Sequence, residues 1–439
     1  MRGTACRRAP PDARAHGMER PVERLVIVGG GMAAGRLIDE LQQRAPRRYE
    51  IAVLAAEAGG IYNRILLSSV VAGEKSATDS VTHTPAWCAH RGIAYQANTL
   101  VTAVDRTQRL AITPHGAVPY DRLVLATGSR PIILPLPGVD LPGVLAFRDL
   151  ANVERLLRGA AAGRRAVVIG GGLLGLEAAA GLARRGVAVT VLHLMPHLME
   201  RQLDADAASL LRDELAGRGI DVRLGAHTAT IEGGETVEGV RLTDGTVLPA
   251  DLVVMAVGVR PNADLARASG LDVGRGVVVD DTLATSDPAI SALGECIEHR
   301  GQTFGLVAPI WEQAKALAQR LAGDDATYAG SVSATSLKVS GVALYSAGDH
   351  IGDTECETIT LRDRALGSYR KLVLRNDRLA GAVLYGDATD GNWYLDLITS
   401  GVAIGPMREA LVFGRRFAEV PACEIDDDAP GLALNEASA

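Results

Sequence analysis

The chain has few cysteines, and they are far apart. Of 439 residues five are cysteine, namely Cys6, Cys88, Cys296, Cys356 and Cys423. No two of them form the closely spaced pair that a zinc knuckle or a CxxC redox motif requires. The sequence therefore predicts no metal site. An odd number of thiols without framework spacing indicates a reducing compartment, and we expect a cytoplasmic protein.

An excess of positive charge and a long apolar run are missing as well. Lys and Arg total 45 against 52 Asp and Glu, which gives a net charge of −7. This charge offers no attraction for nucleic acid or an anionic membrane. No segment reaches the roughly 18 apolar residues of a membrane span. Residues 1–21 are rich in Arg and lack an apolar stretch, so we expect a disordered arm. Met18 is an alternative start, which leaves translation of residues 1–17 open.

From Val22 onward the chain alternates short apolar strands with amphipathic helices, which is typical of an α/β fold. After about residue 329 shorter strand-like pieces, such as Ser336–Leu344, are separated by turns, which predicts a small α+β domain. The main predicted strands are Leu25–Val28, Ile51–Leu54, Leu123–Ala126, Ala166–Ile169, Val189–Leu192 and Leu252–Val257.

One segment of the sequence occurs twice. Val26–Gly31 (VIVGGG) returns as Val167–Gly172 (VVIGGG), and an apolar helix is expected after each copy. Two strand–glycine–helix units in one chain predict two nucleotide-binding sites.

The first glycine motif has the spacing Gly29-x-Gly31-x-x-Ala34. The first Gly permits a tight turn, the second lets the backbone approach a pyrophosphate, and the third small residue packs helix on strand. The phosphate charge then lies at the helix N-terminus. Glu57, beyond the second strand, is placed to accept a hydrogen bond from a ribose hydroxyl. The predicted contacts of the loop are Gly29, Gly31, Met32, Ala33 and Ala34.

The second motif, Gly170-x-Gly172-x-x-Gly175, has the strict form. The residue expected to meet its ribose is His193, where NAD sites usually carry a carboxylate and NADP sites have an Arg nearby. Arg201 could reach a 2′-phosphate, although an exposed Arg on the next helix is the favoured interpretation. The choice between NADH and NADPH therefore stays open, with NADH favoured. The predicted contacts are Gly170, Gly172, Leu174, Gly175 and His193.

Three further segments resemble the pyridine nucleotide–disulfide oxidoreductases, flavoproteins with two dinucleotide-binding domains. They are Leu125–Ser129 (LATGS), Gly258–Asn262 (GVRPN) and Ser291–Glu295 (SALGE). The resemblance implies FAD in the first domain and NADH or NADPH on the second. It also implies contacts of the cofactors with Ala126, Thr127, Gly128, Gly258, Gly294 and Glu295. Glu295 would bind the ribityl chain, where Asp is commoner in the family.

Longer stretches resemble the FAD-binding half of the large subunits of assimilatory NAD(P)H nitrite reductases. They include Tyr62–Ser68 (YNRILLS), His193–Asp204 (HLMPHLMERQLD) and Leu337–Asp349 (LKVSGVALYSAGD). Those subunits continue into iron–sulfur and sirohaem modules built around cysteine, whereas here only Cys423 follows Cys356. We therefore expect a chain that is not a complete nitrite reductase. A redox-active cysteine near Tyr62–Ser68 is also absent, so electrons are expected to leave the flavin directly.

The resemblance also suggests residues for the reaction. Arg64 is predicted to be a cation beside the flavin and Glu177 its pairing partner, although a plain interdomain salt bridge is an equal alternative. A helix beginning near Pro309 would direct its positive end toward the reduced flavin, because proline suits a first helical turn. Val307, Ala308 and Pro309 complete the predicted cofactor contacts.

The predicted fold is α/β, with two Rossmann-like dinucleotide-binding domains for FAD and NAD(P) and a small α+β C-terminal domain. We expect the FAD-binding domain at residues 22–150 and 264–328 and the NAD(P)-binding domain at 151–263. The C-terminal domain is predicted at 329–415, with a possible homodimer contact, and a loose tail at 416–439.

The predicted function is transfer of electrons from NAD(P)H through FAD to a separate acceptor protein. The suspected acceptor is an iron–sulfur and sirohaem nitrite reductase or a molybdenum nitrate reductase subunit. One alternative is a rubredoxin- or ferredoxin-type reductase. The other is a flavin-binding assembly or redox-sensing subunit without turnover, which the intact glycine motifs disfavour.

Overall fold

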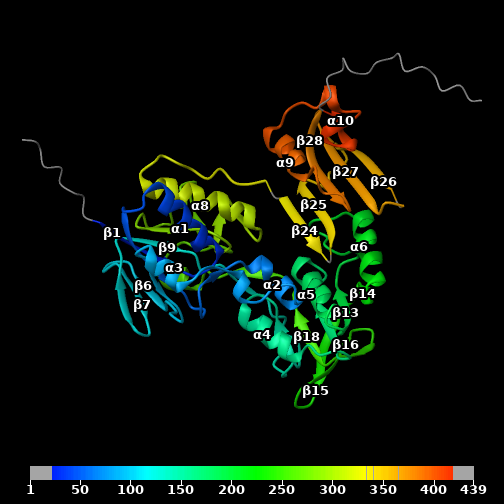
Figure 1. Ribbon diagram of the computed structural model, residues 1–439, viewed down its shortest axis with the longest axis horizontal. Helices are drawn as coiled ribbons and strands as arrows, with labels where there is room; N and C mark the ends of the chain where they lie inside the picture. The colour runs from blue at the N-terminus through cyan, green and yellow to red at the C-terminus, as the bar shows by residue number, and fades with distance from the viewer. Residues whose placement is uncertain (1–21, 333, 340, 364, 419–439) are drawn as a thin grey trace, which may run out of the picture.

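The computed structural model describes residues 22–332, 334–339, 341–363 and 365–418. The arm predicted at 1–21 and most of the predicted tail, 419–439, lie outside these residues. Within residues 22–332 the chain forms two five-stranded parallel sheets, and an antiparallel sheet follows them (Figure 1).

The first sheet has the strand order β21-β9-β1-β2-β5, and every neighbouring pair is parallel. Its central strands bury the apolar runs Leu25–Val28 and Leu123–Leu125, as expected where helices cover both faces of a parallel sheet. Helices α1 and α8 lie side by side over it (Figure 1). The elements are β1 (Glu23–Val28), β2 (Tyr49–Leu54), β5 (Ala94–Gln96), β9 (Arg122–Leu125), β21 (Ile290–Ala292), α1 (Met32–Arg44), α3 (Pro85–His90) and α8 (Val307–Ala322).

Shorter elements complete the first domain. They are β3 (Ile61–Tyr62), β4 (Val81–His83), α2 (Leu67–Val71), the antiparallel sheet of β6 (Ala103–Asp105), β7 (Leu110–Thr113) and β8 (Gly116–Pro119), then α7 (Asp264–Ala268), β20 (Val277–Val279), β22 (Ile297–His299) and β23 (Gln302–Thr303).

The second sheet repeats the first with the order β11-β18-β12-β13-β14, again parallel throughout. A three-stranded antiparallel sheet precedes β18, as another precedes β9. The elements are β11 (Val144–Ala146), β12 (Arg165–Ile169), β13 (Ala188–His193), β14 (Ile220–Leu224), β15 (Thr228–Gly233), β16 (Val237–Leu242), β17 (Val247–Pro249), β18 (Leu252–Met255), α4 (Leu150–Gly159), α5 (Leu173–Ala183) and α6 (Ala205–Gly217).

Strand β11 corrects one predicted boundary. It pairs with β18 in the second sheet, so that sheet includes residues before the predicted domain start at 151. The strand has three residues and joins the sheet at its edge, which gives too short an apolar pattern to assign from sequence.

The two sheets are joined at their carboxyl ends. The chain leaves β9 through β10 (Ser129–Pro131) and returns from β18 through β19 (Val259–Pro261), and these two strands pair antiparallel. The carboxyl edge of an open parallel sheet is where nucleotides bind. The two-stranded β10–β19 ribbon therefore connects the two candidate sites, one on either side of it.

The C-terminal sheet is antiparallel, in the order β24-β25-β28-β27-β26. It corrects the single predicted piece Ser336–Leu344, which spans two strands of a hairpin. Asn376 and Asp377, with φ of 50° and 56°, form the tight turn before β28. The elements are β24 (Ala334–Val339), β25 (Val342–Gly348), β26 (Glu357–Asp363), β27 (Ser368–Arg375), β28 (Arg378–Tyr385), α9 (Gly391–Ser400) and α10 (Arg415–Ala418).

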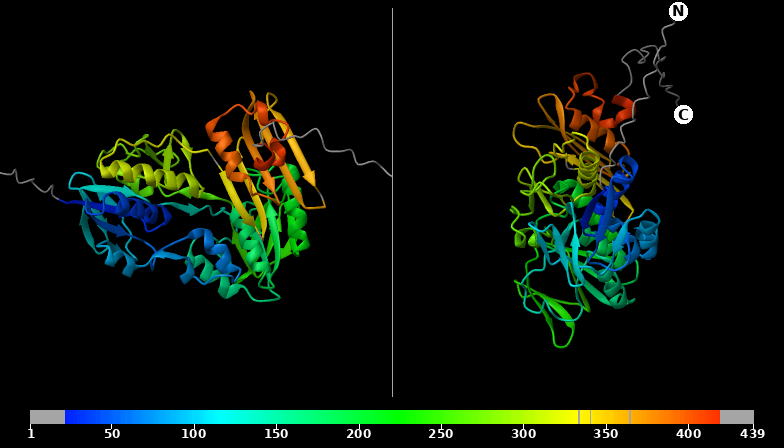
Figure 2. Two further views of the ribbon diagram at one scale, coloured as in Figure 1. Left: turned by 45° about the horizontal axis from the view of Figure 1, so that its top comes forward. Right: turned by 90° about the vertical axis from the view of Figure 1, so that its left-hand side faces the viewer.

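This sheet packs on the second domain near α5 and α6 (Figure 2). The Tyr369 hydroxyl donates to the carboxylate of Asp204 at 2.6 Å, and Tyr385 donates to the backbone carbonyl of Leu210 at 3.1 Å. Asp204 also caps the N-terminus of α6. The C-terminal domain is therefore held to α6, the helix that follows His193–Asp204 in the second domain.

Candidate functional site

The first glycine loop has the geometry of a pyrophosphate cradle. Gly29 has φ of +118°, and a Cβ there would lie 2.2 Å from the carbonyl oxygen of Ala126. Around Gly31 a Cβ would meet nothing within 4 Å, so the backbone is open on that side. Helix α1 starts just after Gly31 with no side-chain cap and no acidic residue in its first turn. Its N–H groups are thus available to an anion.

Segments distant in sequence meet this loop. A Cβ on Gly294 would lie 3.0 Å from Cβ of Ala33, and the Gly294 N–H donates to Oε1 of Gln313 in α8 at 2.8 Å. The Thr127 hydroxyl donates to the carbonyl of Asn262 at 2.7 Å. The structure therefore brings the predicted Gly29–Ala34, Ala126–Gly128 and Gly294–Glu295 segments together.

Glu295 lies in a small polar cluster beside them. The Ser129 hydroxyl donates to its carboxylate at 2.6 Å, and Arg148 forms an ion pair with it. Nε of Arg148 is buried and has no hydrogen-bond partner within the described part of the chain. A buried donor of this kind favours a polar ligand nearby. Together with the open loop, it fits the predicted FAD. Arg148 was missed at the sequence level, where no motif marks it.

Helix α8 begins two residues earlier than predicted. It starts at Val307, so Val307, Ala308 and Pro309 form its first turn, where proline removes no intrahelical hydrogen bond. Its N-cap, Leu306, provides no side-chain bond, and the first turn holds no acidic residue. Because Gln313 of this helix holds Gly294, the uncapped N-terminus is fixed relative to the predicted flavin segment.

Arg64 pairs with Glu57 and not with Glu177, which corrects the predicted pair. Arg64 forms an ion pair with the Glu57 carboxylate and donates to the Tyr62 hydroxyl at 2.6 Å. Tyr62 in turn donates to Glu57 at 2.6 Å, and burial raises its pKa well above the ordinary value. Arg64 is near in sequence to Tyr62 and follows the same turn after β3, so the local turn brings it to Glu57.

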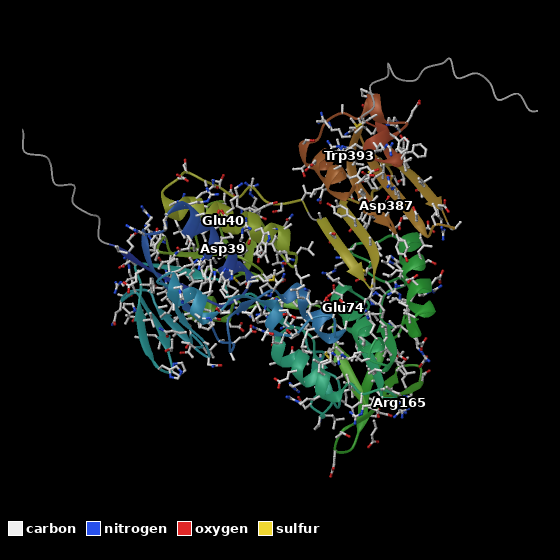
Figure 3. All side chains as sticks on the ribbon, viewed as in Figure 1. Asp39, Glu40, Glu74, Arg165, Asp387 and Trp393 are labelled. Carbon is white, nitrogen blue, oxygen red and sulfur yellow. The ribbon has the colours of Figure 1, made fainter. Side chains whose placement is uncertain are left out.

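Glu177 lies instead where the two domains pack together. Its helix α5 packs against α2 of the first domain, which begins next to Ser68. Burial raises the pKa of Glu177 to about 7, and the Ser68 hydroxyl lowers it in part. Glu74, which follows α2 and is labelled in Figure 3, forms an ion pair with Arg184 at the same junction. Glu177 is thus a partly buried carboxyl without an arginine partner in the described residues.

The second glycine loop repeats the first. Gly170 has φ of +121°, and a Cβ there would lie 2.2 Å from the carbonyl oxygen of Ala256. A Cβ on Gly175 would lie 2.0 Å from the carbonyl oxygen of Gly170, so the helix approaches this loop closely. Gly172 is open, and α5 begins after it without a side-chain cap or an early acidic residue. Gly258, beyond β18, has φ of +117°, as a tight turn requires.

His193 does not lie as predicted. Its ring is buried, Nδ1 accepts a hydrogen bond from the Gly171 N–H at 3.1 Å, and Nε2 lies 3.1 Å from a carboxylate oxygen of Glu200. Both ring nitrogens are thus used inside the protein. The predicted contact of His193 with a ribose hydroxyl does not fit this arrangement, because neither nitrogen is left for it.

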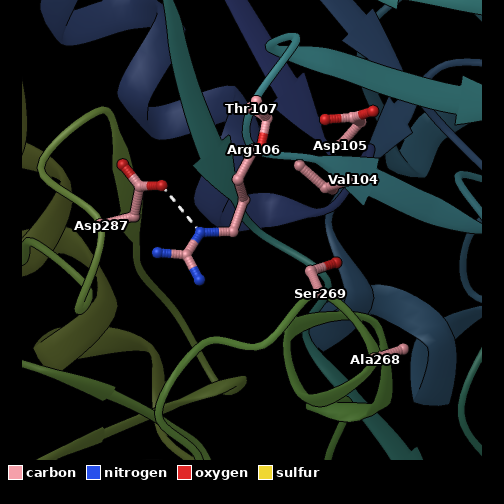
Figure 4. A pocket seen from close by; sticks show the side chains of 7 residues that line it. All are labelled: Val104, Asp105, Arg106, Thr107, Ala268, Ser269 and Asp287. Carbon is pink, nitrogen blue, oxygen red and sulfur yellow. Dashed lines mark hydrogen bonds and ion pairs between the residues drawn. The ribbon is translucent and has the colours of Figure 1, made fainter.

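A surface hollow lies beside β6 and α7, away from both glycine loops (Figure 4). Nε of Arg106 donates to Asp287 at 2.8 Å, and a terminal nitrogen donates to the carbonyl of Gly270 at 2.8 Å. This arginine ties three segments of the first domain together, and the lining includes no residue of the glycine loops. The lining residues are Val104, Asp105, Arg106, Thr107, Ala268, Ser269 and Asp287.

Within the described residues, no group of three or more His, Cys, Asp or Glu side chains is arranged to hold a metal ion. In the same part of the chain, every helix is too short or too polar to cross a membrane.

Comparison with known families decides the identity of this arrangement. Residues 23–316 match the family described as pyridine nucleotide-disulphide oxidoreductase. The chain belongs to the pyridine nucleotide-disulphide oxidoreductase family. Residues 334–402 match the C-terminal domain of rubredoxin NAD+ reductase. The predicted membership, the two Rossmann-like domains with a small C-terminal domain, and the predicted FAD-dependent NAD(P)H oxidoreductase class are thereby confirmed.

Two relatives from Bacillus subtilis (strain 168) are similar over most of the chain. A nitrite reductase [NAD(P)H] is 47% identical over 86% of this chain and 47% of its own length. An assimilatory nitrate reductase electron transfer subunit is 40% identical over 92% of this chain and 53% of its own length. The chain therefore spans about half the length of these two relatives.

A solved structure shares the fold. A chain of the crystal structure of the covalent putidaredoxin reductase–putidaredoxin complex superposes with a TM-score of 0.81 and 29% identity. The match covers 87% of this chain and 94% of that one. Nearly the full length of that chain is thus matched here.

Proposed function

We propose that this oxidoreductase takes electrons from NAD(P)H through FAD and delivers them to a separate redox protein of nitrite or nitrate assimilation. The observation that carries the proposal is the pair of equivalent glycine loops, Gly29–Ala34 and Gly170–Gly175, joined through the β10–β19 ribbon. Two dinucleotides held at carboxyl edges that share one connection can bring their reactive rings together. The similarity to the two Bacillus subtilis proteins supports the nitrogen-assimilation partner.

The protein residues contribute positioning and charge. When bound, FAD supplies the hydride-accepting and electron-carrying chemistry. The uncapped N-terminus of α1 would bind the FAD pyrophosphate, and Glu57 the adenosine ribose. Ala126, Thr127 and Gly128 would line the flavin, and Glu295 would hold the ribityl chain. The uncapped N-terminus of α8, at Val307–Pro309, would stabilise negative charge on the reduced ring.

The second domain would hold the electron donor. The N-terminus of α5, after Gly172, would bind its pyrophosphate, and Leu174 would lie in the first turn of that helix. Gly258 would shape the turn along which the nicotinamide approaches. Glu177 remains our candidate for a group near the reacting rings. Arg64 would instead hold Glu57 at the adenosine ribose, because the structure pairs these two residues.

The acceptor we propose is a separate protein carrying iron–sulfur, sirohaem or molybdenum centres. Cys88 and Cys296 are buried and Cys356 is partly buried, and all three are free thiols. No described cysteine pair is therefore available to relay electrons as a disulfide. A chain with free thiols also suits the cytoplasm, which we propose as its compartment.

A second candidate acceptor is rubredoxin or a ferredoxin-type protein. The match of residues 334–402 to the C-terminal domain of rubredoxin NAD+ reductase favours it, as does the likeness to the putidaredoxin reductase complex.

Reconstitution separates the two candidates. The FAD-loaded protein would be mixed with NADH and, in separate reactions, with a nitrite reductase catalytic subunit, a nitrate reductase catalytic subunit and a rubredoxin. Our proposal expects nitrite or nitrate turnover at least about tenfold faster than rubredoxin reduction. Faster reduction of rubredoxin would favour the second candidate. A Gly170→Ala variant, expected to keep FAD but not NADH, serves as the control for electron flow through the second loop.

A further inference from the structure

The end of the second strand in a dinucleotide-binding unit is where the adenosine ribose is recognised, usually by a carboxylate. In the second domain this strand is β13, and His193 ends it. Its Nδ1 accepts from the Gly171 N–H at 3.1 Å, so that nitrogen carries no proton. The proton of the neutral ring is therefore on Nε2, which donates to the Glu200 carboxylate at 3.1 Å. The histidine thus connects the glycine loop to a carboxylate.

The backbone before Glu200 is anchored to the same loop. The Met199 N–H donates to the carbonyl of Gly171 at 3.1 Å, and Met199 has φ of +51°. Leu198 and Met199 are both 1% exposed, so their side chains fix the segment in the core. Gly171 is therefore bonded through its N–H to His193 and through its carbonyl to Met199. These two independent contacts place Glu200 beside the glycine loop.

Glu200 remains accessible to a ligand. Its side chain is 30% exposed, and within the described residues its one ion-pair partner is the His193 ring. Arg201, the next residue, is exposed and forms no ion pair in the described part of the chain. The carboxylate thus has an oxygen left to accept from a hydroxyl, while its negative charge is not cancelled by an arginine or lysine.

We propose that Glu200, positioned by His193, binds the adenosine ribose hydroxyls of the donor and makes NADH preferred over NADPH. The inference rests on the proposed binding of NAD(P)H at the second glycine loop. A carboxylate accepts hydrogen bonds from the 2′- and 3′-hydroxyls of NADH. The 2′-phosphate of NADPH carries up to two negative charges, offers no hydroxyl at that position and is repelled by the carboxylate.

The test measures binding as well as reduction. Isothermal titration calorimetry of the FAD-loaded protein with NAD+ and NADP+ gives the ratio of the two affinities. Anaerobic stopped-flow reduction by NADH and NADPH gives the same preference in the reaction. Glu200→Gln keeps the shape of the side chain and removes its charge. We expect it to lower the NAD+/NADP+ affinity ratio by about tenfold or more, since tenfold corresponds to the loss of one modest charge interaction.

Three further variants refine the test. Arg201→Gln should leave the ratio unchanged or raise it, because it removes the neighbouring positive charge. His193→Asn keeps an acceptor for Gly171 but no longer reaches Glu200, whereas His193→Gln can still donate to Glu200. We expect His193→Asn to raise KM for NADH severalfold with kcat little changed, and His193→Gln to restore part of it.

A ratio within twofold of the wild type in Glu200→Gln would overturn the proposal. If that variant does not retain FAD, Glu200→Asp is measured in its place. It keeps the negative charge and should still discriminate against NADPH. Equal use of NADH and NADPH by Glu200→Asp would also overturn the proposal. Failure of both nucleotides to bleach the wild-type flavin would instead overturn the proposed function, and the outcomes are therefore distinguishable.

Discussion

The two dinucleotide-binding domains differ far less in scaffold than in the residues that follow their second strands. The sheets have the same strand order, and both first glycines leave 2.2 Å between a would-be Cβ and a carbonyl oxygen. The repetition extends to an ion pair at the start of each first strand. Arg24 forms an ion pair with Asp121, which also accepts from the Arg24 backbone N–H at 2.8 Å. Arg165, labelled in Figure 3, forms an ion pair with Asp251, which accepts from the Arg165 backbone N–H at 2.8 Å.

Beyond the second strands the likeness ends. In the first domain Glu57 is paired with Arg64 and Tyr62, whereas in the second His193 is buried against the loop and presents Glu200. The third position of the glycine motif also differs. Ala34 is accommodated in the first domain, but the second needs Gly175 because its helix is closer to the loop. The comparison teaches that the backbone cradle is shared, while the side chains beside it differ between the two domains.

The largest expected effect comes from the first glycine of each loop. Gly29→Ala and Gly170→Ala both place a Cβ against a carbonyl in a left-handed backbone conformation. We expect Gly29→Ala to lower FAD affinity more than about 100-fold. Gly170→Ala should keep FAD but slow flavin reduction by NADH by a similar factor. Flavin content and stopped-flow reduction measure the two effects. Loss of FAD in both variants to the same extent would break the assignment of separate sites.

The next effect concerns Glu177, which occupies in α5 the position that Arg36 has in α1. Because the folded pKa of Glu177 is raised to about 7, its carboxyl stays protonated as the pH rises above the ordinary value. The stability gained from this protonation is present at low pH and is lost as the pH rises to about 7. The loss is at most about 3 kcal/mol. Glu177→Gln should remove this dependence, which urea unfolding at pH 5 and pH 8 would measure.

Ser68→Ala is the matched control for Glu177. It removes the hydroxyl that lowers the pKa of the carboxyl, so the loss of stability should extend to higher pH. An identical pH dependence of unfolding in Glu177→Gln and the wild type would show that another group titrates in this range.

The smallest expected effect is that of Arg64→Ala. Its carboxylate partner, Glu57, is 44% exposed, so the ion pair contributes little to stability. We expect FAD affinity to fall by about threefold, measured from the flavin fluorescence released on dilution. Tyr62→Phe, which removes the bridging hydroxyl, should have a similar effect. A 30-fold slower reduction of the flavin at full FAD occupancy would instead favour the role beside the reacting rings that the sequence predicted for Arg64.

The sequence predicts local features of this molecule well. The apolar runs ending at Val28 and Ile169 and the glycines after them are local signals, and they identify the strands and loops that hold both sites. The family resemblance adds Ala126–Gly128 and Gly294–Glu295, which the structure brings to the first loop. These features depend on short sequence stretches, so they can be predicted without knowledge of the tertiary contacts.

Contacts between segments are less predictable. Arg64 and Glu177 were paired by resemblance, but the turn after β3 directs Arg64 to Glu57. Strand β11 is too short for its apolar pattern to predict which sheet it joins. Glu200 is missed because its approach to the glycine loop depends on the positive φ of Met199 and the burial of Leu198. No spacing rule in the sequence encodes that loop conformation.

The most direct test of the central claim is an anaerobic titration of the purified, FAD-loaded protein with NADH, followed in the visible spectrum. The account predicts an oxidised-flavin band that bleaches with about one equivalent of NADH, since one hydride reduces one flavin, and that returns when the acceptor protein is added. A flavin band that NADH and NADPH both leave unchanged, or a protein that binds no flavin, would contradict it.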